Sequence, residues 1–308
     1  MLVVGSCNGM IRALDRKTGQ VRWSYDIRKD GEQSQFHGDP LITDQLVIIG
    51  TDGSMGHVYA FERSTGTVRW KFKVAERGVT TDVIRVGQNI YAVTRGDELL
   101  CLDLDTGKAK WTFRTGAPLP GSGWTSSPAV TSERAYFGGF DGFVYAVDAK
   151  SGKLIWKRDL GARITTSVAL VGRDLYVGTD QRRLYRINAE SGEVSGSLDT
   201  AASPRSRLIA SPEGLLVFLG DDILASVDPS LKKVQWSAEA SKEWTSARPY
   251  FWKALVLAGD RRRLVALRPG DGAREWSREF PETIRGIGVS DEVLFVGSLK
   301  GPIFAYVP

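Results

Sequence analysis

The sequence predicts an all-β protein, an eight-bladed β-propeller of four-stranded antiparallel blades with incomplete first and last blades. Two observations predict this fold. A tryptophan recurs behind a polar turn, and from Trp70 the successive steps between the equivalent positions are 41, 45, 40, 40 and 40 residues. Each period also contains four short runs rich in β-branched and aromatic residues. Four strands in about 40 residues are typical of one propeller blade.

The fourth repeat shows the four strands most completely. The first three are expected at residues 127–130, 135–139 and 143–147, and the fourth at 153–156, where it ends on Trp156. Residues 140–142 join the second strand to the third and contain an Asp-Gly pair. Because both residues tolerate positive φ, this segment predicts a tight hairpin.

The turn before the fourth strand has a physical reason to recur. In the first repeat it runs from Asp15 to Gly19, four residues before Trp23. The Asp side chain can accept hydrogen bonds from backbone N–H groups two or three residues on, and glycine takes the left-handed conformation that reverses the chain. The flat indole suits the gap between blades, and a feature of nearly every repeat usually serves packing rather than ligand binding. We therefore expect six tryptophans to dock the blades: Trp23, Trp70, Trp111, Trp156, Trp236 and Trp276.

Two repeats depart from this frame. The fifth has Gly196 in the tryptophan position, and the sixth keeps Trp236 but has Lys232 in the glycine position. Such substitutions indicate either drift or an edge adapted to a partner. We interpret both as drift.

The array is predicted to form one domain over residues 1–308, because each repeat buries its apolar faces against its neighbours. The blades are expected near 1–27, 36–74, 78–115, 124–160, 164–200, 204–240, 244–280 and 284–308. The first blade lacks its first strand and the last lacks its fourth. We expect roughly 20 to 25 residues, about half a repeat, to precede Met1 and complete both blades. The alternative is that two three-stranded blades are tolerated.

Composition favours a folded protein and narrows its partners. The chain is 42% hydrophobic and 25% charged, and its net charge of +5 comes from basic and acidic residues spread along the whole length. Without a basic tail or a basic helix, nucleic acid is a poor candidate partner. No apolar stretch approaches the roughly 20 residues of a membrane helix, and no signal peptide is present at the start as written. Cys7 and Cys101 are expected to be free, buried thiols.

The repeat resembles that of a known superfamily. Residues 134–156 carry nearly the whole pattern Val-Tyr-Val-Gly-Ser-x-Asp-Gly-x-Val-Tyr-Ala-Leu-Asp-x-x-Thr-Gly-x-x-x-Trp, which is similar to the pyrroloquinoline-quinone-type propeller repeat. That superfamily includes quinone-dependent dehydrogenases, sensor domains attached to bacterial kinases, and BamB, the propeller lipoprotein of outer-membrane barrel assembly. The dehydrogenases are much longer, so the compact chain looks most like the assembly lipoprotein. The resemblance implies a non-catalytic interaction scaffold, with envelope or outer-membrane protein assembly as its expected role. The alternative is a quinone-dependent dehydrogenase or a small-ligand sensor domain.

The residues that the dehydrogenase alternative requires are not visible. The resemblance implies that such enzymes carry adjacent cysteines beside the quinone, an acidic base and a calcium site of Glu, Asn and Asp. Cys7 and Cys101 are not adjacent, and no acidic cluster offers the six to eight oxygens that calcium needs. With His37 and His57 as the two histidines, a multi-histidine metal site is excluded and a histidine-based triad is disfavoured. No catalytic, cofactor-binding or metal-binding residue is assigned, and no cofactor is expected.

One face of the propeller is predicted to carry basic side chains. Loops between the fourth and first strands, and turns between the second and third, open on the same face of a propeller. Arginine there can bind carboxylates or phosphates through two parallel hydrogen bonds. Alternatively, these are solvated charges balanced by Asp97, Glu98, Asp221 and Asp222. The candidate residues for an anion-attracting or partner-binding face are His37, Arg77, Arg163, Arg182, Arg183, Arg205, Arg262, Arg263 and Arg285.

These features predict a monomer that binds a protein partner through loops on one face. The compartment does not follow from the chain alone. The resemblance implies a periplasmic or outer-membrane-associated protein if an export signal precedes the sequence, and otherwise a cytoplasmic one.

Overall fold

The predicted fold class is confirmed. A computed structural model describes residues 1–31, 35–53, 56–74, 78–96, 98–115, 127–211, 213–245, 248–290, 292–298 and 301–306. Within these residues the chain is an eight-bladed β-propeller of small antiparallel sheets, and its helical content is a single 3-10 turn, η1 (Ile27–Asp30). The chain forms two compact units, Met1–Arg163 (unit 1) and Ile164–Pro308 (unit 2).

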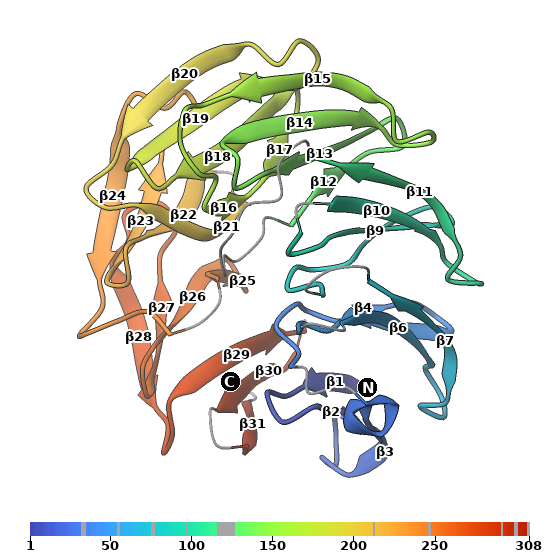
Figure 1. The fold of residues 1–308 in the computed structure, drawn as a ribbon. Helices are drawn as coiled ribbons and strands as arrows, with labels where there is room; N and C mark the ends of the chain where they lie inside the picture. The colour runs from blue at the N-terminus through green and yellow to red at the C-terminus, as the bar shows by residue number, and fades with distance from the viewer. Residues whose placement is uncertain are drawn as a thin grey trace. The chain divides into compact units, whose positions relative to one another are not determined.

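Unit 1 contains four sheets that follow one another in sequence (Figure 1). The first has three strands, in the order β1-β2-β3, and each of the others has four. The strands are β1 (Leu2–Gly5), β2 (Met10–Leu14) and β3 (Val21–Asp26); β4 (Leu41–Ile42), β5 (Leu46–Gly50), β6 (His57–Glu62) and β7 (Val68–Lys73); β8 (Ile84–Val86), β9 (Asn89–Val93), β10 (Glu98–Asp103) and β11 (Ala109–Arg114); β12 (Ala129–Val130), β13 (Arg134–Gly138), β14 (Phe143–Asp148) and β15 (Leu154–Asp159).

Unit 2 contains the other four sheets, and the last has three strands in the order β29-β30-β31. One pairing departs from the repeat: the two-residue strand β16 pairs in parallel with β21 and adds a fifth strand to that sheet. The strands are β16 (Thr166–Ser167), β17 (Ala169–Val171), β18 (Asp174–Thr179), β19 (Arg183–Asn188) and β20 (Val194–Asp199); β21 (Pro204–Ala210), β22 (Leu215–Leu219), β23 (Ile223–Val227) and β24 (Val234–Glu239); β25 (Tyr250–Trp252), β26 (Leu255–Asp260), β27 (Arg263–Leu267) and β28 (Arg274–Glu279); β29 (Ile284–Val289), β30 (Leu294–Ser298) and β31 (Ile303–Tyr306).

The fourth strand of a blade is longer than the sequence predicts. Trp156 is the third residue of the six-residue strand β15, so the prediction that the strand ends on the tryptophan is wrong. β15 pairs with β14 on both sides of a register shift between Ala146 and Val147. The residues after Trp156 alternate between exposed and half-buried, and such a surface strand lacks the apolar signal on which the prediction relied.

The second strand of a blade is buried on both faces, which explains its continuous apolar sequence. All five residues of β5 are buried. Leu46 and Ile48 join a core cluster with Ile90 and Leu100 of the third sheet. Val47 and Ile49 join a different cluster, which contains Ile11 and Ala13 of the first sheet. Because successive side chains of a strand point to opposite faces, one strand supplies two inter-blade cores.

The recurring tryptophan contacts the turn of the next blade along the chain. Trp70 donates its indole N–H to Leu104 O at 2.9 Å, and this carbonyl lies one residue into the next turn. The ring covers Gly107, where an added Cβ would lie 2.5 Å from Trp70 Cδ2. Gly107 has φ +68°, so glycine is required here both for the left-handed turn and for the indole contact. The same pair of contacts joins Trp23 to Arg63 O and Gly66, Trp111 to Ala149 O and Gly152, and Trp236 to Pro269 O and Gly272.

The junction between the fifth and sixth blades is inverted. Gly196 stands in the tryptophan position, and the next turn approaches it through Ser230 O. The left-handed residue of that turn is Leu231, with φ 57°, rather than Lys232 in the glycine position, and Leu231 is buried in the core of this junction. Tyr176 donates its hydroxyl to Pro229 O at 2.8 Å, and Pro229 occupies the position of the carbonyl that other repeats give to an indole. The contacts favour a coupled replacement, in which the large residue lies on the opposite side of the junction, over the independent drift inferred from the sequence.

Candidate interaction face

In each unit, the turn between the second and third strands of a blade lies against the loop that follows its fourth strand. The first residue after β20, β24 and β28 donates its backbone N–H to such a turn: Thr200 to Arg182 O, Ala240 to Asp222 O and Phe280 to Arg262 O. In unit 1 Leu160 donates to Gly142 O in the same way. The two loop families therefore meet at one end of the strands, and this end is the candidate interaction face.

Hydrogen bonds also connect neighbouring turns of unit 2. Ser203 donates its hydroxyl to Asp180 O and accepts from Gly220 N, which links the turn of the fifth blade to that of the sixth. Trp244 N donates to Asp221 O, and Trp244 forms a β-bridge with Asp260, which links the sixth turn to the seventh. The turns of three successive blades are thus fixed side by side by hydrogen bonds.

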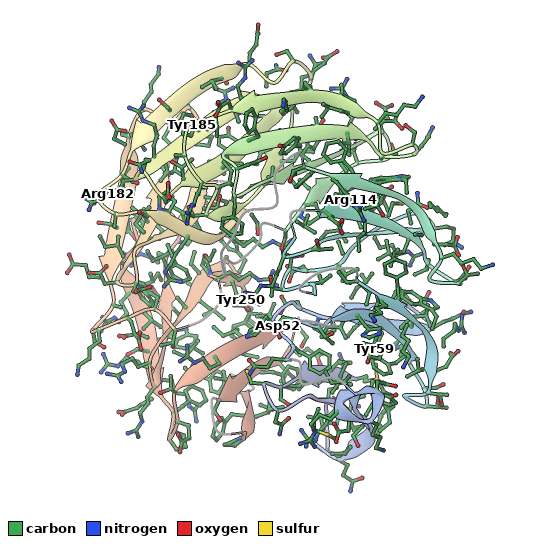
Figure 2. All side chains as sticks on the ribbon, in the orientation of Figure 1. Asp52, Tyr59, Arg114, Arg182, Tyr185 and Tyr250 are labelled. Carbon is green, nitrogen blue, oxygen red and sulfur yellow. The ribbon has the colours of Figure 1, made fainter. Side chains whose placement is uncertain are left out.

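Two arginines in these turns have left-handed backbones. Arg182 (Figure 2) has φ 56° and Arg261 has φ 54°. Glycine holds positive φ in equivalent hairpins, at Gly142 and Gly220. An ordinary side chain with a left-handed backbone costs about 1 kcal/mol relative to glycine. Strain of this kind can accompany function, but Ser206, Leu231, Lys253 and Ala254 also have positive φ, so it supports a site only together with other observations.

The seventh-blade turn lines a pocket of about 240 Å³ together with Ser241, Asp260, Glu279 and Thr283. The buried Asp260 carboxylate accepts hydrogen bonds from the Ser241 hydroxyl at 2.7 Å and the Ser241 backbone N–H at 3.1 Å. Arg262 donates Nε–H to Phe280 O at 3.0 Å and lies 3.8 Å from the exposed Glu279 carboxylate. In the part of the chain that the structure describes, Arg261 and Arg263 form no ion pair. This pocket brings together the predicted residues Arg262 and Arg263 with Arg261 of the same turn.

Two other predicted arginines form hydrogen bonds with neighbouring residues of the protein. Arg183 forms a two-pronged pair with Asp199, with Nε 2.6 Å from Oδ1 and Nη2 3.1 Å from Oδ2, and this pair raises the pKa of the guanidinium. Arg205 donates to the carbonyls of Gly220 and Trp244, and its guanidinium stacks 4.9 Å from the Phe218 ring. Burial lowers the pKa of Arg205, although nearby Asp221 opposes this effect. Its role here is to fix the sixth-blade turn.

The remaining predicted residues lie in different places. His37 Nδ1 lies 2.8 Å from Asp52 Oδ2 in unit 1 (Figure 2). Burial raises the pKa of Asp52, but hydrogen bonds from His37 and Gln35 N outweigh it and the pKa is lowered. Arg163 in unit 1 and Arg285 in unit 2 are exposed. Arg77 lies outside the described residues.

Two of the acidic residues of the balancing hypothesis have other partners. Glu98 pairs with Arg114 at 2.6 Å, and Asp221 lies 3.1 Å from Arg205. Asp97 lies outside the described residues. Asp222 is exposed, and among the described residues its side chain forms no ion pair. Among the described residues, Glu98, Asp221 and Asp222 therefore form no ion pair with the arginines of the seventh-blade turn.

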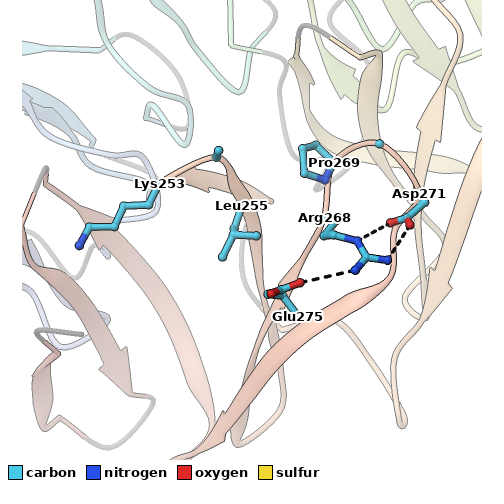
Figure 3. A pocket seen from close by; sticks show the side chains of 8 residues that line it. Lys253, Leu255, Arg268, Pro269, Asp271 and Glu275 are labelled. Atoms are coloured by element: carbon cyan, nitrogen blue, oxygen red, sulfur yellow. Dashed lines mark hydrogen bonds and ion pairs between the residues drawn. The ribbon is translucent and has the colours of Figure 1, made fainter.

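A second pocket lies at the other end of the seventh blade (Figure 3). It measures about 570 Å³ and lies between the β25–β26 hairpin and the turn before β28. Its charges largely cancel, because Arg268 pairs with Asp271 at 2.7 Å and lies 3.7 Å from Glu275. Lys253 lies 4.8 Å above the Trp252 ring. The open shape and the internal ion pairs make it a weaker candidate site than the turn face.

Sequence reasoning missed some contacts and misplaced one thiol. Trp252 lies outside the repeated frame, yet its indole donates to Ser290 O at 2.6 Å in the next blade. Asp30 accepts hydrogen bonds from Tyr25, Tyr59 and Lys71. The repeat pattern does not predict this cluster, because Asp30 lies in η1. Cys101 is buried and free, but Cys7 is exposed because it lies in the turn after β1. The described residues contain no group of three potential metal ligands, and none of their helices is long and apolar enough to cross a membrane.

The fold and this face define a pyrroloquinoline-quinone-type propeller with loop-bearing turns at one end. The family model for the outer membrane protein assembly factor BamB matches residues 7–142, 54–227, 140–288 and 220–306, which together span nearly the whole chain. The chain belongs to this family.

Individual relatives are distant. The assembly factor BamB of Yersinia pestis is 28% identical over 157 residues, covering 46% of this chain and 40% of that protein. BamB of Burkholderia pseudomallei is 22% identical over 85% of this chain and 69% of its own length. A quinone-dependent alcohol dehydrogenase subunit of Gluconobacter oxydans is 27% identical over 72% of this chain but 30% of its own length. The chain spans about half the length of the first curated relatives it matches.

The structure of BamB from Moraxella catarrhalis superposes with a TM-score of 0.81 at 17% identity, covering 99% of this chain and 93% of that one. The computationally designed Ika8 protein has a TM-score of 0.82 at 14% identity, covering 99% and 92%. At these identities the likeness concerns the fold alone.

Proposed function

We propose that this protein is a non-catalytic propeller scaffold in outer-membrane protein assembly, and that it binds a protein partner through the turns of its candidate interaction face. The observation that supports this most is the match of the assembly-factor family from residue 7 to residue 306. The inter-blade contacts support it further, since they fix the turns on a rigid framework, and recognition residues often lie on loops held this way. A periplasmic location at the outer membrane is part of the proposal.

Depleting the protein from its own bacterium tests the role in assembly. The amount of folded outer-membrane barrel protein, measured by heat-modifiable electrophoretic mobility, should fall and should recover when the native gene is supplied. An unchanged amount would contradict the proposal. Charge reversal of Arg262 and Arg263 together should weaken complementation, whereas Arg268→Glu at the opposite end should leave it intact.

Similarity to a quinone-dependent alcohol dehydrogenase supports one alternative, a quinone-binding propeller. Adding pyrroloquinoline quinone and calcium to the pure protein distinguishes the two functions. The scaffold should show neither a shifted absorption spectrum nor a raised melting temperature. A saturable spectral change accompanied by thermal stabilisation would favour the alternative.

A further inference from the structure

We propose that the seventh-blade pocket is a carboxylate-binding subsite, and that it recognises a protein segment that places one acidic side chain beside a basic one. The pocket is the one lined by Ser241, residues 260–263, Glu279 and Thr283. This inference rests on the proposed function, because it names the chemistry of the partner that the face would take.

The strained turn provides the first argument. Arg261 is the first of the two residues between Asp260 and Arg263, which are paired in the hairpin. A two-residue hairpin with positive φ at this position is best formed by glycine. Arg261 nevertheless occupies it, with φ 54°. Backbone strain therefore accompanies an exposed guanidinium at the pocket, which is what a binding role would require.

The second argument is the supply of hydrogen-bond donors. Arg262 uses its Nε–H on Phe280 O, and the described residues offer Arg261 and Arg263 no ion-pair partner. The hydroxyl of Ser241 is occupied by Asp260, which holds that carboxylate beneath the turn. A carboxylate is the anion whose two oxygens match a guanidinium fork.

Charge decides which anion fits. Three guanidiniums share the pocket with the carboxylates of Asp260 and Glu279, which leaves a net charge of about one positive. The neighbouring turn carries Asp221, whose side chain is 81% exposed, and Asp222. Trp244 joins the two turns, so these carboxylates lie on the turn next to the pocket. A polyanion or an anionic lipid surface is repelled there, whereas a segment with one carboxylate and an adjacent cation is attracted to both turns.

Titration with defined peptides tests the subsite on the intact protein. The probes are a glycine-based peptide with one Glu and one Lys two residues apart, the same peptide with Glu in both positions, and vesicles containing anionic phospholipid. Binding is followed through the arginine Nε–H signals in nuclear magnetic resonance. The Glu-Lys peptide should bind more tightly than the Glu-Glu peptide and shift the Arg261 and Arg263 signals. Equal or tighter binding of the Glu-Glu peptide or of the vesicles, or no binding of any probe, overturns the proposal.

Glycine substitution separates recognition from structure. Arg261→Gly should weaken binding of the Glu-Lys peptide about tenfold, which corresponds to one strong hydrogen-bonded pair. It should not lower the melting temperature of the protein. The matched control is Lys253→Gly, which also replaces a basic left-handed residue (φ 48°) but lies at the other end of the seventh blade, and it should leave peptide affinity unchanged. Equal effects of the two variants contradict a specific subsite.

Asp222→Lys tests the role of the acidic turn. It keeps the pair between Arg205 and Asp221 and should reverse the preference toward the Glu-Glu peptide. An unchanged preference contradicts the role of the acidic turn.

The result is independent of the assembly experiment. Peptide selectivity with an unchanged level of outer-membrane proteins on depletion would retain the subsite and reject the proposed function. Loss of those proteins on depletion, with no peptide selectivity, would retain the function and reject the subsite.

Discussion

The junctions of unit 1 and the junction between the fifth and sixth blades in unit 2 solve one packing problem in opposite ways. In unit 1 an indole from one blade covers a left-handed glycine of the next, as Trp70 covers Gly107. In unit 2 the glycine lies on the first blade, at Gly196, and a buried left-handed Leu231 lies in the next turn. The carbonyl after the turn's first residue accepts a side-chain hydrogen bond in both cases, from an indole in one and from Tyr176 in the other. What the fold maintains is therefore a filled gap and a satisfied carbonyl rather than a particular residue.

Removing an indole should have the largest effect. Trp70→Ala deletes a buried ring and leaves Leu104 O without its indole donor, so we expect a loss of about 3–5 kcal/mol in the free energy of unfolding. Urea denaturation followed by circular dichroism measures it. A loss below about 1 kcal/mol would mean that the indole is peripheral to the junction.

Adding one carbon to the glycine that the indole covers should have the second-largest effect on stability. Gly107→Ala places a Cβ 2.5 Å from the Trp70 ring, and the φ of +68° adds backbone strain, so we expect a cost of about 2–4 kcal/mol. Gly87→Ala is the matched control, because Gly87 has φ +58° but no atom within 4 Å of an added Cβ. It should cost about 1 kcal/mol, the strain alone. Equal melting temperatures of the two variants would contradict the indole contact.

Two tyrosine hydroxyls test how much the side-chain hydrogen bond to the turn carbonyl stabilises each kind of junction. Pro229 O accepts from Tyr176, whereas Ala149 O accepts from both Tyr91 and Trp111. Tyr176→Phe should therefore leave its carbonyl unsatisfied and cost about 1–2 kcal/mol, and Tyr91→Phe should cost less than about 1 kcal/mol. Chemical denaturation of both variants checks the order, and the reverse order would contradict this account of the junctions.

High pH should produce the smallest of these effects. Burial raises the pKa of Tyr91 to about 12, although a hydrogen bond from Asn89 opposes the shift. In the unfolded chain the phenol ionises near pH 10, so between about pH 10 and pH 12 the unfolded state binds fewer protons and stability falls as pH rises. The melting temperature should therefore drop over this window, and Tyr91→Phe should reduce the drop. An identical drop in the variant would exclude Tyr91 as a contributor.

The repeat made most of the fold predictable from the sequence. A period near 40 residues gave the eight-bladed class, and the incomplete end blades followed from keeping the repeat in register. Strand lengths were less predictable, because the residues after Trp156 lie on a half-exposed strand without an apolar pattern. The inverted junction could not be predicted from single positions. Gly196 and the turn that contains Leu231 approach each other only in the folded chain.

The candidate face was partly predictable. Register placed the arginine turns at one end of the strands, where their backbones meet the loops between blades. It could not distinguish Arg205, which stacks on Phe218, from Arg261, which lines a pocket, because that difference depends on side-chain contacts made only in the folded chain. The contact of Trp252 with Ser290 was missed for the same reason.

The most direct test of the central claim is a double-mutant cycle at the inverted junction. Gly196→Trp alone should destabilise the protein because the backbone of Ser230, beside Leu231, already lies against Gly196. Leu231→Gly alone should destabilise it by opening a cavity. If the two positions form one exchanged pair, the double variant will be more stable than the sum of the single effects by at least about 1 kcal/mol in urea denaturation. Additive effects would contradict the exchange and return the two substitutions to independent drift.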